Sequence, residues 1–319
     1  MIVETSMAEK KLISIITPCY NEEENIETCY HEIKTIMAQY PQYRYEHIFI
    51  DNASKDKSVE ILKNLAQNDK NLKIIVNLKN FGQVRSPFYA QILAKGDAVI
   101  PMHCDLQEPP ELIHKFLKKW EEGYKIVIAI KDKSNENFFL SILRKTYYAI
   151  IAKISETEQI GNFVGIGLYD KSFMQILHKL NITNPYFRGL VAEFGTERAE
   201  IPYIQRNRSK GKTKNNLYTL YEYAMLGFVS HSKVPLRLAS FIGFIFSTLS
   251  LIISAIYFIY KLIYWNNFQV GMAPLVIGLF FFFSVQLFFI GILGEYIGQI
   301  LIQVRNHPLV IEKERINFD

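Results

Sequence analysis

The stretch ISIITPCYNEEENI, residues 13–26, decides the fold of this chain. Residues 13–17 are rich in isoleucine and stop at Pro18, a pattern that predicts a short buried strand. Acidic residues from Asn21 onward favour the first turn of a helix, which we expect to continue to about residue 37. The alternation repeats further along, with strands expected at 45–50, 72–76, 98–102 and 124–130 and helices at 57–67 and 110–122. Strands that alternate with helices predict an α/β domain with a mostly parallel sheet.

Polar residues follow three of these strands at the point where each strand ends. They form the segments 18–22 (PCYNE), 51–54 (DNAS) and 103–107 (HCDLQ). Parallel sheets bind ligands beyond the carboxyl ends of their strands, so these segments predict one binding site. No GxGxxG follows the first strand and no GxxxxGK[ST] occurs, which disfavours an NAD-type fold and excludes a P-loop. The segment GNFVGIG, residues 161–167, is more typical of a turn than of a phosphate cradle.

Charge is distributed unevenly along the 319 residues, which carry 36 Lys and Arg against 31 Asp and Glu. Between residues 238 and 304 the charged side chains are Lys261 and Glu295 alone. The uncharged runs 238–260 and 262–294 each exceed the roughly 20 residues that cross a bilayer as a helix. We therefore expect a two-helix transmembrane hairpin at about 236–261 and 272–294, with two buried core helices as the alternative. This pattern excludes a purely soluble protein, a disordered chain and a multi-span transporter.

Positive charges flank the hairpin on the side of the chain termini. Lys233, Arg237 and Arg305 lie there, whereas Lys261 alone lies at the other end. The positive-inside rule then predicts that the soluble domain and both termini are cytoplasmic, at the inner membrane. The expected organisation is a soluble α/β domain (1–215), an amphipathic helix (216–234), two spans (235–304) and a tail (305–319). The helix at 216–234 could lie on the membrane interface or pack on the core.

The ordered motifs PCYNEEENI, IDNASKD and CDLQEPPE resemble family 2 glycosyltransferases of the GT-A fold. With RGL at 188–190, the basic stretch at 202–214 and ILGEYIG at 292–298, the chain is similar to polyprenyl-phosphate glycosyltransferases. That group includes bacterial undecaprenyl-phosphate glucosyltransferases and dolichol-phosphate mannose synthase. The resemblance implies transfer of a monosaccharide from a nucleotide sugar, UDP-linked by preference, to polyprenyl phosphate with inversion. It also implies a homo-oligomer, a tetramer by analogy, and no nucleic-acid partner.

The resemblance assigns residues to two parts of the site. Asp105 and Gln107 would be catalytic and would hold Mg²⁺ or Mn²⁺ near the diphosphate, with His103 as a third ligand or as a neighbour only. His103 stands where relatives carry the first aspartate of the motif. The nucleotide would contact Pro18, Tyr20, Glu22, Asp51, Asn52 and Ser54. Asn52 and Ala53 replace the usual aspartate and glycine.

The acceptor phosphate is a dianion near neutral pH, so as a nucleophile it needs no general base. It needs cations instead, and basic residues alternate at every second position from Arg206 to Lys214, with no acidic residue among them. The resemblance assigns phosphate binding to Arg206, Arg208, Lys214, Lys131 and Arg144. Asn162 stands where relatives often have aspartate, so the resemblance does not identify which sugar is transferred.

Two other functions fit parts of the sequence. A processive polysaccharide synthase would carry a QxxRW signature, which is absent, and would need more spans. A catalytically impaired membrane scaffold is motivated by the substitutions at His103, Asn52 and Asn162. The retained Asp51, Asp105, Gln107 and basic residues favour the enzyme.

Overall fold

The computed structural model describes residues 10–132, 160–206, 234–264 and 272–318. The strands are β1 (Leu12–Cys19), β2 (Arg44–Asp51), β3 (Leu72–Asn77), β4 (Ala98–Pro101), β5 (Ile126–Lys131), β6 (Phe163–Asp170), β7 (Ala199–Tyr203) and β8 (Glu312–Ile316). The helices are α1 (Ile26–Met37), α2 (Ser58–Asn68), α3 (Gly82–Leu93), α4 (Leu112–Glu121), α6 (Lys171–Lys179), α7 (Phe187–Phe194), α9 (Val234–Ile263) and α10 (Met272–Val304). The expected helix at 216–234 lies almost wholly outside these residues.

All the described strands form one sheet in the order β7-β5-β6-β4-β1-β2-β3-β8. The first four strands are parallel to one another, while β6 and β8 run antiparallel to their neighbours. The prediction of a mostly parallel α/β sheet is confirmed. Because β2 and β3 lie on one side of β1 and β4 lies on the other, the strand order reverses between β1 and β4. Parallel sheets bind ligands in the crevice beyond the carboxyl ends of the strands at such a point.

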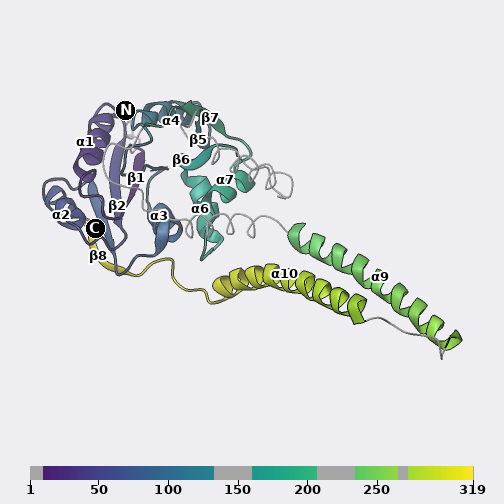
Figure 1. Cartoon of the computed structure of the whole chain (residues 1–319). Helices are drawn as coiled ribbons and strands as arrows, with labels where there is room; N and C mark the ends of the chain where they lie inside the picture. The colour runs from purple at the N-terminus through teal and green to yellow at the C-terminus, as the bar shows by residue number, and fades with distance from the viewer. Residues whose placement is uncertain (1–9, 133–159, 207–233, 265–271, 319) are drawn as a thin grey trace.

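Helices cover both faces of the sheet, and each face has its own apolar core. One core includes residues of α1, α2 and α4, among them Ile33, Leu62 and Phe116. The other includes Phe88 of α3 and Phe173 of α6, together with residues of α7. Strands whose side chains are apolar on both faces need both faces of the sheet to be covered. The result is a rigid three-layer support for the loops at the carboxyl edge (Figure 1).

The interpretation of GNFVGIG as a turn is wrong, because most of this segment belongs to β6. A side chain at Gly167 would overlap the carbonyl oxygen of Val127 on β5. Gly165 adopts φ 101°, a conformation that glycine tolerates and other residues rarely adopt. These glycines therefore permit close strand pairing. The first helix also starts later than expected, at Ile26, because residues 21–25 form turns in which Asn21 has φ 52°.

The last residues of the chain return to the soluble domain. β8 pairs antiparallel with β3 at the edge of the sheet, with Ile316 opposite Ile74. The Asn317 side chain donates hydrogen bonds to the carbonyl oxygens of Ala66, Asp69 and Leu72, at 3.0, 3.3 and 2.8 Å. The tail expected at 305–319 thus completes the sheet, and the soluble domain is built from both ends of the chain.

Helices α9 and α10 extend away from the domain as an apolar pair (Figure 1). Each contains a 28-residue segment, Leu236–Ile263 and Ile277–Val304, that is long and apolar enough to span a membrane and is not buried by the protein. Phe246 of α9 packs edge-on against Phe281 and Phe282 of α10, with ring centroids 6.1 and 6.0 Å apart. These contacts support the expected hairpin.

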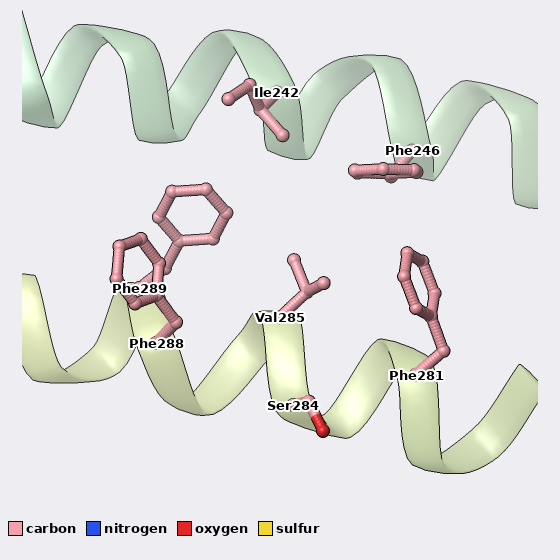
Figure 2. A pocket seen from close by; sticks show the side chains of 7 residues that line it. All are labelled: Ile242, Phe246, Phe281, Ser284, Val285, Phe288 and Phe289. Carbon is pink, nitrogen blue, oxygen red and sulfur yellow. The ribbon is translucent and has the colours of Figure 1, made fainter.

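A space of about 390 Å³ separates the middle of the two helices (Figure 2). Its lining is aromatic and aliphatic apart from one hydroxyl, and consists of Ile242, Phe246, Phe281, Ser284, Val285, Phe288 and Phe289. The hydroxyl of Ser284 donates to the carbonyl oxygen of Phe280 at 2.9 Å in its own helix. A polar group in hydrocarbon must find such a partner, so the lining is compatible with lipid.

The C-terminal end of α10 contacts the soluble domain directly. Thr183 Oγ1 donates to Gln303 Oε1 at 3.0 Å, and Asn184 Nδ2 donates to Gln299 Oε1 at 3.2 Å. Gln299 and Gln303 are four residues apart and therefore share one helix face. Helix α10 continues ten residues past the predicted end at residue 294. The last turns of this helix form hydrogen bonds with the loop before α7.

Candidate active site

Hydrogen bonds join the loops that follow β1 and β2. The backbone N–H of Asn21 donates to Ser54 Oγ at 2.7 Å, and the N–H of Glu22 donates to Ser58 Oγ at 2.9 Å. Asp51 Oδ2 accepts from the N–H of Ser54 at 3.0 Å. These bonds hold the two loops together at the end of the sheet where the sequence places a ligand site. Of the predicted residues, they unite Glu22, Asp51 and Ser54.

Asp51 is fully buried at the end of β2. Burial raises the pKa of its carboxyl group, although hydrogen bonds from Ser54 and Ala53 oppose the rise. Ala53 adopts φ 64° directly after it. A left-handed conformation at a residue with a Cβ is strained, which explains why glycine is usual at this position in the resembling family. An ionised carboxylate here offers hydrogen-bond acceptors only, and it has no exposed surface in this structure.

The side-chain amide of Asn52 forms all of its hydrogen bonds within the protein. Its Oδ1 accepts from the N–H of Phe81 at 2.9 Å and from Asn77 Nδ2 at 3.2 Å. Its Nδ2 donates to Asn80 Oδ1 at 2.9 Å and to the carbonyl oxygen of Gly82 at 3.1 Å. An amide has two acceptor and two donor positions, and all four are occupied. The contact of Asn52 with the nucleotide therefore remains only a prediction.

His103 lies across the crevice, in the loop after β4. Its Nδ1 is 2.8 Å from Oε2 of the buried Glu108, whose Oε1 is 3.5 Å from the hydroxyl of Tyr203 on β7. Burial lowers the pKa of His103, but the Glu108 carboxylate outweighs this and raises it to about 9. Glu108 thereby occupies Nδ1, so Nε2 is the ring nitrogen left for a metal, and it would have to lose its proton to bind one.

Asp105 and Gln107 are half-buried in the same loop. Asp105 Oδ1 accepts from the N–H of Gln107 at 3.3 Å, and Leu106 between them has φ 56°. Among the described residues no three His, Cys, Asp or Glu side chains group as a metal site. One carboxylate and one amide oxygen nevertheless suit a hard cation that takes its other ligands from phosphate and water. The donor set therefore fits Mg²⁺ or Mn²⁺.

Two of the predicted phosphate-binding cations lie at the same sheet edge. The N–H of Arg206 donates to the carbonyl oxygen of Gln107 at 2.9 Å, which places the start of the basic stretch against the Asp105 loop. Lys131 ends β5 opposite Tyr203 of β7. The Arg206 guanidinium pairs with Glu111 at 2.8 Å on the exposed rim. Arg144, Arg208 and Lys214 lie outside the described residues.

Several residues shape the site without having been predicted. Glu108 and Tyr203 orient His103, Asn21 bridges to Ser54, and Glu111 holds Arg206. Glu108 and Glu111 belong to the motif CDLQEPPE, so acidic residues beside the predicted ligands were a usable signal. Tyr203 offered no such signal, because its role arises from the pairing of β7 with β5.

Known proteins resemble the chain over nearly its whole length. Residues 14–180 match the family described as glycosyl transferase family 2. An uncharacterized glycosyltransferase, YkcC, from Bacillus subtilis is 32% identical, covering 96% of this chain and 94% of the relative. A prophage-derived bactoprenol glucosyl transferase from Shigella flexneri is 32% identical, covering 95% and 97%. The structure of glucosyl-3-phosphoglycerate synthase from Mycobacterium tuberculosis with UDP is 15% identical, with a TM-score of 0.47, covering 69% and 78%.

Proposed function

The chain belongs to glycosyl transferase family 2, and from this premise we propose that it transfers a sugar from a nucleotide sugar to polyprenyl phosphate. Relatives named bactoprenol glucosyl transferase match 94–95% of the chain, a span that includes the membrane helices. The observation that carries the proposal is the contact between Arg206 and Gln107. It joins a cationic segment suited to an acceptor phosphate with the loop suited to the donor diphosphate.

The topology of the chain supports a reaction at the cytoplasmic face. β8 follows α10 in the chain yet lies in the same sheet as β1–β7. The residues before α9 and after α10 are therefore on one side of the membrane, so the pair of helices crosses as a hairpin. Arg237 and Arg305 on that side favour the cytoplasm under the positive-inside rule. A lipid phosphate in the inner membrane would then approach from the side of the helices.

Each part of the site has a role in the proposed reaction. Asp51 would accept a hydrogen bond from the nucleoside, and Asp105 with Gln107 would hold the divalent cation. That cation supplies neutralisation of the diphosphate leaving group. Arg206 and Lys131 would dock the acceptor phosphate, together with Arg144, Arg208 and Lys214 as predicted from the sequence.

The proposed chemistry is a single displacement. A phosphate oxygen of the acceptor attacks the sugar C1 while the bond from C1 to the diphosphate oxygen breaks, and the nucleoside diphosphate leaves. Attack from the face opposite the leaving group inverts the anomeric centre. The nucleophile is already ionised near pH 7, so the site needs orientation and charge neutralisation rather than a base.

A transfer assay tests this proposal. Purified full-length chain would be incubated with undecaprenyl phosphate, Mg²⁺ or Mn²⁺, and a panel of sugar-labelled UDP- and GDP-sugars. We expect chloroform-soluble label from one donor, which would also identify the sugar, the nucleotide and the preferred metal. Absence of lipid-linked label from every donor, with no stabilisation of the protein by UDP or GDP, would contradict the proposal and favour the scaffold.

The predicted homo-oligomer rests on the family resemblance alone. The apolar faces of α9 and α10 are exposed along the described residues and would contact either lipid or other copies. Light scattering with correction for bound detergent would measure the number of chains in a particle. A tetramer would agree with the prediction, and a monomer would exclude it.

A further inference from the structure

The loop 78–82, which joins β3 to α3 and includes Gly82 as the first residue of that helix, lies beside the proposed nucleotide site. β1, β2 and β3 are adjacent and parallel, with Cys19 opposite Asp51 and Asp51 opposite Val76. The segments that follow these strands therefore start at the same edge of the sheet. The nucleoside end of a donor that contacts Asp51 would have this loop as its neighbour.

The side chain of Asn52 holds this loop through three hydrogen bonds. Asn52 bonds to the side chain of Asn80, to the N–H of Phe81 and to the carbonyl oxygen of Gly82. Its own N–H donates to the carbonyl oxygen of Cys19 at 3.0 Å. Asn52 thus ties the loop after β3 to the ends of β1 and β2. The side chain is 7% exposed, so these bonds are shielded from water.

The tethered loop carries the ring of Phe81, which has two cations near it, one from the loop and one from α3. Lys79 Nζ lies 5.3 Å and Arg85 Cζ lies 5.7 Å from the centroid of the Phe81 ring. The start of α3 is unusual as well, since Gly82 has φ 85° and donates to Asn80 Oδ1 at 2.8 Å. Glycine tolerates this conformation, and the bond to Asn80 fixes the turn that begins the helix. Loss of the Asn52 amide would release the segment that presents Phe81 and Lys79.

We propose that Asn52 is a positioning residue for the donor nucleotide, acting through the loop 78–82 rather than by contact. This inference rests on the proposed function and specifies how the nucleotide end of that site is built. The ligand class is a nucleoside diphosphate, whose base and anionic phosphates suit an aromatic ring with cations near it. In this chain the network needs an amide at position 52, because the side chain accepts two hydrogen bonds and donates two.

Asn52→Asp tests the inference with almost no change in shape. The carboxylate cannot donate to Asn80 or Gly82, so the loop loses two of its bonds. We expect the Kd for UDP or GDP, whichever the wild type binds, and the KM for its sugar donor to rise by about tenfold. The kcat and the KM for undecaprenyl phosphate would stay within about twofold, since neither depends on the loop.

Asn317→Asp is the matched control. Asn317 also donates from its side chain to backbone carbonyl oxygens, but at the amino end of β3 beside Leu72. Both variants would lower the melting temperature of the full chain in detergent, and only Asn52→Asp would weaken nucleotide binding. Equal nucleotide affinity in the two variants and wild type would overturn the inference. If Asn52→Asp does not fold, Asn80→Ala removes one bond of the same tether and should raise the Kd by about threefold.

The outcome for the wild-type chain separates this inference from the proposed function. A wild type that binds neither nucleotide and transfers no sugar would remove both. A wild type that transfers sugar, with Asn52→Asp unchanged in Kd and donor KM, would overturn the positioning role alone. A rise in the acceptor KM in place of the donor KM would also contradict it.

Discussion

Replacing Glu111 by glutamine should strengthen binding of the lipid acceptor. Arg206 Nη2 lies 2.8 Å from Glu111 Oε1, and the side chains are 47% and 57% exposed. An exposed pair of this kind is worth about 0.2–1 kcal/mol. An acceptor phosphate that binds Arg206 must first displace Glu111, so the neutral variant should lower the KM for undecaprenyl phosphate by about 1.4- to fivefold.

The control variant is Glu122→Gln, which breaks another exposed pair at the opposite end of α4. Lys119 Nζ and Glu122 Oε2 are 2.6 Å apart, with side chains 39% and 40% exposed. Initial rates against undecaprenyl phosphate would be measured in low salt and again in about 0.5 M salt, where screening should reduce the effect. An acceptor KM that is unchanged or higher in Glu111→Gln, or that falls equally in Glu122→Gln, would refute the competition.

Three further predictions concern stability. Ala53→Gly should raise the free energy of unfolding by about 0.5–1 kcal/mol, because glycine relieves the φ of 64°; an unchanged or lower value in denaturant titration would contradict this. Gly167→Ala should cost about 1–3 kcal/mol, since its Cβ would overlap the Val127 carbonyl oxygen; a wild-type melting temperature would count against it. Burial lowers the pKa of His47 to about 3, below its value near 6.5 in the unfolded chain. The neutral His47 therefore contributes fully to the free energy of unfolding above pH 6.5, and this contribution is lost as the pH falls, by at most about 1.4 kcal/mol per pH unit. His47→Gln should flatten the melting temperature between pH 6.5 and 5, and an unchanged slope would exclude this role.

The central strands could be predicted because their sequences are short, mostly apolar and rich in isoleucine. The runs at 13–17 and 45–50 are almost wholly buried in the parallel part of the sheet, polar members such as Ser14 and Glu46 included. Helix α3 was missed because GQVRSPFYAQIL contains Pro87 and has no clear apolar face. β8 could not be predicted either, because EKERI is almost entirely charged and becomes a strand only by pairing with β3.

The residues of the site also divide into those that local sequence identifies and those that only the folded chain brings together. Asp51, Asp105 and Gln107 drew attention by their places after strands, because the carboxyl-edge rule brings their loops to one side of the sheet. Their roles were predicted from the family resemblance. The partners of those residues come from elsewhere in the chain. Glu108 could be paired with His103 only once the loop was folded, and Asn52 needed the neighbouring β3 to show that its amide is fully used.

The most direct test of the account is the transfer of sugar from UDP-glucose, or from the donor that the panel identifies, by wild type and Asp105→Asn. Both chains would be purified at full length in detergent and supplied with undecaprenyl phosphate and Mn²⁺. We predict lipid-linked label from the wild type and a loss of roughly a hundredfold or more in the variant, with UDP still bound through the Asp51 side of the crevice. Equal transfer by the two chains would contradict the role of Asp105, and label that never enters the lipid fraction would contradict the account as a whole.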